Sequence, residues 1–179
     1  MGLLEMRKTA FLCSSKTTSR NVIDSFDWAT HVPKDTCIIG GFQTKLEKDV
    51  LQLLLKQHIP VIIVLARKMY KNLPAEIMVA IERNEALVIS VSHLSRNTKE
   101  SAFARNKFVM EHADEIVFGA LDASSSLYTL AQQYQNKTKN AITFDAQWSL
   151  LHEATKVIAM AIEAYFIKNM PFYRFRAIL

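Results

Sequence analysis

The stretch "TCIIGGFQTKLEKDVLQLLLKQHIPVIIVL", residues Thr36–Leu65, holds two short apolar runs separated by a longer amphipathic segment. The second run, Val61–Leu65, is apolar at consecutive positions, which is typical of a strand covered on both faces in a parallel sheet. The segment before it repeats apolar residues at helical steps, at Leu46, Val50, Leu53 and Leu54. The pattern predicts a strand at Thr36–Ile39, a helix, and a second strand.

The same alternation extends in both directions along the chain. Further strands are expected at Thr9–Cys13, Leu87–Val91, Glu115–Phe118 and Ala141–Phe144, with amphipathic segments between them and a long last helix at Ala146–Lys168. Strictly alternating strands and helices predict an α/β fold, a three-layer, doubly wound and mostly parallel sheet of about six strands. The length of 179 residues suits one domain, expected over residues 1–168, with residues 169–179 as a C-terminal tail.

The amino-acid composition limits which classes of protein this chain can belong to. Half of the residues are hydrophobic and 22% are charged, which excludes a disordered chain. A net charge of +5 favours anionic partners such as nucleotides or nucleic acid, although it equally serves solubility. Cys13 and Cys37 both fall in apolar runs, as reduced core cysteines of a cytoplasmic protein do. No apolar run is long enough for a signal peptide or a membrane helix, so no membrane partner is expected.

The loops that follow the strands share one composition. Ligands of open parallel sheets bind outside the carboxyl ends of the strands. These loops are rich in Gly, Ser, Thr, Lys and Arg and contain few carboxylates, which predicts an anion-binding rim. The candidate residues in the first and third of these loops are Ser14, Ser15, Lys16 and Arg67.

The glycine pair opens the second loop. "TKLE" (Thr44–Glu47) fits a capping box, so Gly40 and Gly41 would form a tight turn into the helix. Without a Cβ, they could take positive φ and let a phosphate lie near the helix N-terminus, beside Phe42, Thr44 and Lys45. The alternative is a bare turn with a close helix–strand contact. The sequence matches neither the dinucleotide fingerprint nor the P-loop.

Two further clusters carry polar groups. "ARNKF" (Ala104–Phe108) is expected to open the helix before the fifth strand and offers Arg105, Asn106 and Lys107 to a phosphate or base edge. "DASSS" places Ser124, Ser125 and Ser126 at another helix start, with Ser124 as the expected N-cap. A solvated basic loop and plain helix capping remain the alternatives for these two clusters.

Signs of catalysis are scarce. The five histidines lack metal-ligand spacing, no serine stands in a G-x-S-x-G elbow, and both cysteines lie in expected strands. Glu47 is engaged in the capping box, and Asp122 is the other carboxylate that can be placed at the rim. No catalytic residue, metal or cofactor is predicted.

Together, "GGFQTKLE", "ARNKFVMEHADEIVFGALDASSSLYTLA" and their spacing resemble the Rossmann-like domain of the DNA-processing protein A (DprA/Smf) family, within the DprA/lysine-decarboxylase-like superfamily. The resemblance covers roughly Ile38 to Phe144 and is nearest to short, single-domain relatives. It implies a non-catalytic domain that binds single-stranded DNA or a nucleotide and self-associates. The implied phosphate contacts are Gly40, Gly41, Thr44, Arg105, Asn106, Lys107, Ser124 and Ser126.

The chain departs from the family pattern at one motif. The family turn continues S-G-G-A-R-G-I-D, whereas Phe42 to Lys45 stand here without the arginine and the third glycine. Recombinase loading, known for full-length members of the family, is therefore not expected of this chain.

Two rival functions remain. A nucleotide-processing enzyme is one, but phosphoribohydrolases carry P-G-G-x-G-T-x-x-E where this chain has "GALDASSSLYTLA". A nucleotide-sensing protein that binds a partner is the other, because aromatic residues gather near the C-terminus, at Tyr165, Phe166, Phe172, Tyr173 and Phe175. Those residues also suggest a homodimer surface.

Overall fold

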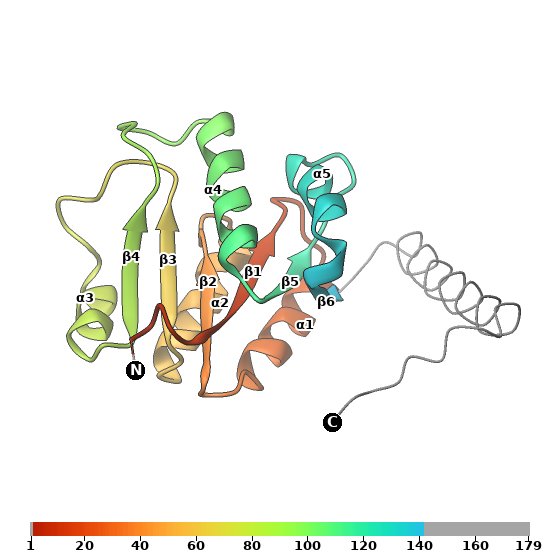
Figure 1. Ribbon diagram of the computed structural model, residues 1–179. Helices are drawn as coiled ribbons and strands as arrows, with labels where there is room; N and C mark the ends of the chain where they lie inside the picture. Colours follow the sequence, from red (N-terminus) through yellow and green to blue (C-terminus); the bar gives the residue numbers. More distant parts are fainter. Residues whose placement is uncertain (1, 142–179) are drawn as a thin grey trace, which may run out of the picture. The chain divides into compact units, whose positions relative to one another are not determined.

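The computed structural model describes residues 2–141, which form one six-stranded parallel sheet with helices on both faces (Figure 1). The strands are β1 (Arg7–Cys13), β2 (Thr36–Gly40), β3 (Val61–Leu65), β4 (Ala86–Ser90), β5 (Glu115–Ala120) and β6 (Thr138–Ala141). The helices are α1 (Ser19–Thr30), α2 (Lys45–Lys56), α3 (Ala75–Glu82), α4 (Lys99–His112), α5 (Ser126–Gln133) and the short 3-10 turn η1 (Gln135–Lys137). The predicted three-layer α/β architecture is confirmed.

The strand order is β4-β3-β2-β1-β5-β6, and every neighbouring pair is parallel. The chain therefore winds outward from β1 to β4 and then returns to the other side of β1 to add β5 and β6. The order reverses between β1 and β5, which is where open α/β sheets most often hold ligands.

Alternate residues of each strand divide the core into two layers. On one face, Phe11, Ile38 and Ile63 pack with α1, α2 and α3. On the other face, Leu12 and Ile39 pack with α4 and α5. Since strand side chains alternate between faces, the continuous apolar runs in the sequence have the physical origin expected of buried parallel strands.

The last described strand differs from its prediction. β6 is Thr138–Ala141, not Ala141–Phe144, and it pairs with Ile116, Val117 and Phe118 of β5. The polar sequence "TKNA" carries no apolar strand signal, so the apolar residues that follow it attracted the prediction. The expected helix Ala146–Lys168 and the tail 169–179 lie outside the described residues.

Gly119 in β5 has no room for a side chain, because it packs closely against residues of the core layer that faces α1, α2 and α3. A Cβ at this position would lie 2.5 Å from Cys13 Sγ, 2.7 Å from the Phe11 ring and 2.8 Å from Ser25 Oγ. We expect Gly119→Ala to reduce the free energy of unfolding by about 1–3 kcal/mol, the usual cost of overpacking a core. Urea denaturation measures this loss. Gly2→Ala is the control, since a Cβ there meets no heavy atom within 4 Å and should leave stability unchanged.

Candidate functional site

The carboxyl edge of the sheet is the more basic of its two edges. The loops that follow β1 to β5 carry five Lys or Arg residues and one acidic residue, namely Lys16, Arg67, Lys68, Lys71, Arg96 and Asp122. The loops at the amino edge of the described chain carry three basic and four acidic residues, namely Lys34, Arg83, Lys137, Glu5, Asp35, Glu85 and Asp114. This asymmetry favours the approach of anions to the carboxyl edge.

The glycine pair is not the open turn that the sequence suggested. No glycine of residues 2–141 has positive φ, and the left-handed residue of the turn is Phe42, with φ of 48°. Gly40 ends β2 against the Phe11 carbonyl oxygen and the Phe42 ring. Gly41 is buried, and a Cβ on it would overlap Nη1 and Cζ of Arg105. The space left by the missing Cβ is therefore filled by the protein's own guanidinium.

Arg105 reaches Gly41 because α4 begins earlier than expected. The helix starts at Lys99 and not at Ala104, since Thr98 accepts a hydrogen bond from the Ser101 N–H and caps it. Arg105 thus lies in the second turn of a helix that packs across β1, β2 and β3. Its exposed fraction is only 5%, so Arg105 is a buried cation and not an open one, and its role as a phosphate contact stays a prediction.

The buried guanidinium of Arg105 has few partners. Nε donates to Asn106 Oδ1 at 2.9 Å, whereas Nη1 has no hydrogen-bond partner within residues 2–141. None of the ion pairs formed among these residues includes Arg105. Burial lowers the pKa of the guanidinium below its ordinary value, and the more distant charge of Glu47 opposes that shift. A desolvated cation without a close counter-charge is costly, and such positions are frequent in functional sites.

Glu47 connects the glycine turn to the centre of the sheet. The predicted capping box is confirmed, with Glu47 N–H donating to Thr44 Oγ1 at 3.2 Å and Thr44 N–H donating to Glu47 Oε2 at 3.1 Å. Oε2 also accepts from the Gln43 N–H, and Oε1 accepts from the Cys13 N–H at 2.9 Å. The carboxylate is 2% exposed, so it serves the backbone and not a ligand.

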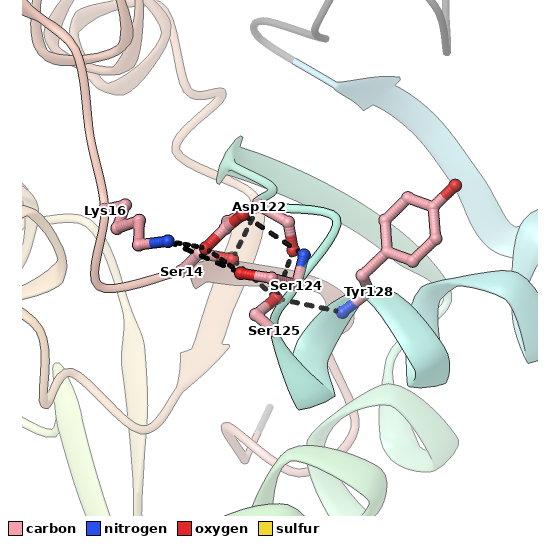
Figure 2. A network of polar contacts seen from close by, with 6 residues as sticks. All are labelled: Ser14, Lys16, Asp122, Ser124, Ser125 and Tyr128. Atoms are coloured by element: carbon pink, nitrogen blue, oxygen red, sulfur yellow. Dashed lines mark hydrogen bonds and ion pairs between the residues drawn. The ribbon is translucent and has the colours of Figure 1, made fainter.

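A second polar cluster occupies the strand-order reversal between β1 and β5 (Figure 2). Ser14 Oγ accepts from the Asp122 N–H at 2.9 Å and lies 3.0 Å from Ser125 Oγ. The Asp122 carboxylate accepts from the N–H and hydroxyl of Ser124 and forms an ion pair with Lys16 at 3.2 Å. The Ser124 N–H is the main cause that lowers the pKa of Asp122, followed by the Ser124 hydroxyl.

The hydroxyls of this cluster bond mainly to the protein itself. Ser125, and not Ser124, is the N-cap of α5, because its Oγ accepts from the Tyr128 N–H at 3.2 Å. Ser124 instead turns toward Asp122, which places a carboxylate beside the N-terminus of α5 (Figure 2). Ser126 begins α5 and is exposed, as is Ser15.

Other predicted site residues separate from these clusters. Lys107 lies two residues from Arg105, which places it on the opposite side of α4, where it pairs with Glu111 at 3.8 Å. Lys45 pairs with Asp49. Phe42 is buried in the core layer that faces α2. The Arg67 guanidinium stacks over the Tyr70 ring at 4.8 Å, and its buried Nε has no partner among the described residues.

Sequence reasoning missed one cavity. A space of about 440 Å³ opens between α2, α3 and the loop that follows β3, with Gly41 and Gln43 in its wall together with apolar residues such as Leu51, Leu73 and Ile77. No local sequence signal marks it, because its walls come from four separate segments.

Reactive thiols, metal ligands and membrane-spanning helices were also sought among the described residues. Burial raises the pKa of the Cys13 thiol well above its usual value, and burial raises the pKa of Cys37 to about 11, so both thiols stay protonated. Within residues 2–141, no three His, Cys, Asp or Glu side chains gather as metal ligands. No helix of this region is long and apolar enough to cross a membrane.

No protein-family model and no curated protein matches the chain. Among solved structures, DNA processing protein A from Helicobacter pylori is similar, with a TM-score of 0.62 and 18% identity over 90% of this chain and 83% of that chain. DNA processing protein A (DprA) from Streptococcus pneumoniae gives a TM-score of 0.60 and 12% identity, over 75% of this chain and 49% of that chain. The chain therefore has a DprA-like Rossmann fold.

Proposed function

We propose that this chain binds single-stranded DNA at the carboxyl edge of its sheet, with Arg105 as the anchor for one backbone phosphate. The observation that carries the proposal is the Arg105 guanidinium, which is buried and has no ion-pair partner among the described residues. Arginine stays protonated in proteins, so its charge persists in the folded chain. Nη1 is closed off beside Gly41, so the proposal requires the Arg105 side chain to move on binding, when a phosphate oxygen supplies the acceptor that the described part of the protein does not offer.

The surrounding charges favour a polymer over a single phosphate. The loops on either side of Gly41 contribute Lys16, Arg67, Lys68, Lys71 and Arg96 to the same edge. Lys16 already pairs with Asp122, and each of the other four exposed or half-buried cations can neutralise one phosphate and release its counterions. A chain of phosphates engages several of them at once, whereas a mononucleotide engages one or two.

The structural likeness supports the choice of ligand class. The H. pylori protein is described as having a single-stranded DNA binding mode, and its fold extends over most of this chain. Together with the basic carboxyl edge, this makes single-stranded DNA the first ligand to test.

A binding role suits this edge better than a catalytic one. Glu47 is committed to three backbone N–H groups, and Asp122 is held by Ser124 and Lys16. The Ser124 N–H and hydroxyl lower the pKa of Asp122, whereas a general base requires a pKa raised toward neutrality. A cytoplasmic location belongs to the same proposal, since Cys13 and Cys37 are free, buried thiols.

Binding of a fluorescent oligothymidylate, followed by anisotropy at two salt concentrations, tests the proposed function. With about three phosphates neutralised, the affinity should fall about 20-fold between ~50 mM and ~200 mM salt, because the slope for single strands is about 0.7 per phosphate. Thymidine monophosphate, added as a competitor, should displace the oligonucleotide only at far higher concentration.

Two outcomes would count against this function. A lack of binding at low salt removes the proposal altogether. Displacement of the oligonucleotide by an equal concentration of thymidine monophosphate would instead identify the site as one for a free nucleotide.

A further inference from the structure

Two neighbouring loops at the carboxyl edge of the sheet are held together by hydrogen bonds. They are residues 66–74, between β3 and α3, and residues 91–98, between β4 and α4 (Figure 1). The Lys68 N–H donates to the Leu94 carbonyl oxygen at 2.8 Å. The hydroxyl of Ser90, at the end of β4, donates to the Arg67 carbonyl oxygen at 2.8 Å. These two loops therefore form one surface, called here the paired loops.

The paired loops carry positive charge without negative charge. Their Lys and Arg residues are Arg67, Lys68, Lys71 and Arg96, and neither loop contains Asp or Glu. None of the ion pairs formed within residues 2–141 involves these four side chains. A basic surface without counter-charges raises the local concentration of a polyanion.

Large apolar side chains are exposed among these cations. Met69, Tyr70 and Leu94 have exposed fractions of 45%, 36% and 47%, and they are three of the seven large apolar residues that the described chain exposes. Apolar side chains interleaved with cations suit a ligand that has both negative charge and apolar surface. Single-stranded DNA is such a ligand, because its bases present flat π faces beside a charged backbone.

Tyr70 is positioned for stacking before any ligand arrives. The Arg67 guanidinium lies over the Tyr70 ring, 4.8 Å from the ring centre, and so restricts the orientation of the ring. Tyr70 and Gly41 line the same cavity beside α2 and α3, and Gly41 is in contact with Arg105. The ring therefore lies on the side of the carboxyl edge where the phosphate anchor is proposed. A ring that is already ordered loses little conformational entropy on binding.

We propose that Tyr70 stacks on a base of the bound strand and that the paired loops thereby select single-stranded over double-stranded DNA. This inference rests on the proposed function and adds a base contact to the phosphate contact of Arg105. The bases of a duplex are already stacked and paired, so bringing one out to Tyr70 costs free energy. Every base has a π face, so the contact tolerates any base sequence.

An abasic oligonucleotide, which keeps the sugars and phosphates but lacks the bases, tests the stacking. Tyr70→Leu should lower the affinity for labelled oligothymidylate by about 5- to 100-fold, the loss expected for one base–aromatic contact. The same variant should bind the abasic oligonucleotide as the wild type does. Leucine is apolar and position 70 is partly exposed, so the variant should fold, which a thermal melt checks.

Tyr70→Phe is the matched control, because it keeps the ring and removes only the hydroxyl. It should bind oligothymidylate and the abasic oligonucleotide as the wild type does. Tyr70→Leu should also lower the ratio of the affinities for oligothymidylate and for a duplex of the same length, since the duplex gains nothing from the ring.

The outcomes separate this inference from the proposed function. If the wild type binds oligothymidylate and Tyr70→Leu binds it equally well, the stacking inference fails while the proposed function stands. An equal loss of affinity for the abasic oligonucleotide means that Tyr70 supports the loop and not a base, which also overturns the inference. A wild-type chain that binds no oligonucleotide at low salt removes both.

Discussion

Replacing Arg105 with methionine is expected to lower the affinity for a single-stranded oligonucleotide by about 10- to 100-fold while the protein remains folded. The estimate follows from the loss of charge-assisted hydrogen bonds to one phosphate, each worth about 1.5–3 kcal/mol. Methionine fills much of the same volume beneath α4 without a charge. Removing a buried cation that lacks a close counter-ion commonly leaves stability unchanged or improves it.

Anisotropy with labelled oligothymidylate and a thermal melt of the same samples measure both effects of Arg105→Met. Lys107→Met is the matched control, because it removes one positive charge from the same helix on the opposite side. The control should change affinity by no more than about two- to threefold, as expected for an exposed, salt-screened cation. Equal losses in the two variants would mean that net charge, and not the buried guanidinium, governs binding.

Replacing Gly41 with alanine is expected to cost about 1–3 kcal/mol of stability and to remove oligonucleotide binding as well. Gly41 does not have positive φ, so alanine brings no backbone strain. The cost arises because the new Cβ would occupy the position of the Arg105 guanidinium and force it to move. Urea denaturation gives the stability, and anisotropy gives the affinity.

A double-mutant cycle separates this cause from a general defect of the turn. In an Arg105→Ala background, Gly41→Ala should cost much less than it does alone, with a coupling of about 2 kcal/mol between the two positions. The same cost in both backgrounds would show that Gly41 serves the turn and not the arginine.

The sheet was predictable because its signals are local. Apolar runs such as Val61–Leu65 and the capping box at Thr44–Glu47 depend on residues that are close in sequence, and both predictions are confirmed. β6 was shifted because a polar edge strand carries no such signal.

The site was harder to predict because tertiary contacts define it. The buried face of α4 consists of Ser101, Arg105, Val109 and Met110, so half of it is polar and hydrophobic periodicity could not reveal where the helix begins. The contact between Gly41 and Arg105 spans 64 positions, and the Glu47–Cys13 hydrogen bond joins residues 34 apart. Of three consecutive hydroxyls, Ser125 became the cap, a position that also brings it within reach of Ser14.

The carboxylate of Asp122 makes the distribution of charge along the carboxyl edge of the sheet uneven, which affects how a polyanion can lie there. Asp122 pairs with Lys16 and already occupies the N-terminus of α5, so the loops above β1 and β5 offer less uncompensated positive charge to a phosphate than the loops above β3 and β4. A bound DNA strand would therefore run from Gly41 toward β4. It would not enter the crevice between β1 and β5, where open α/β proteins commonly bind their cofactors. Neutralising Asp122 would extend the surface that attracts phosphate and shift the position of the bound DNA strand toward β5.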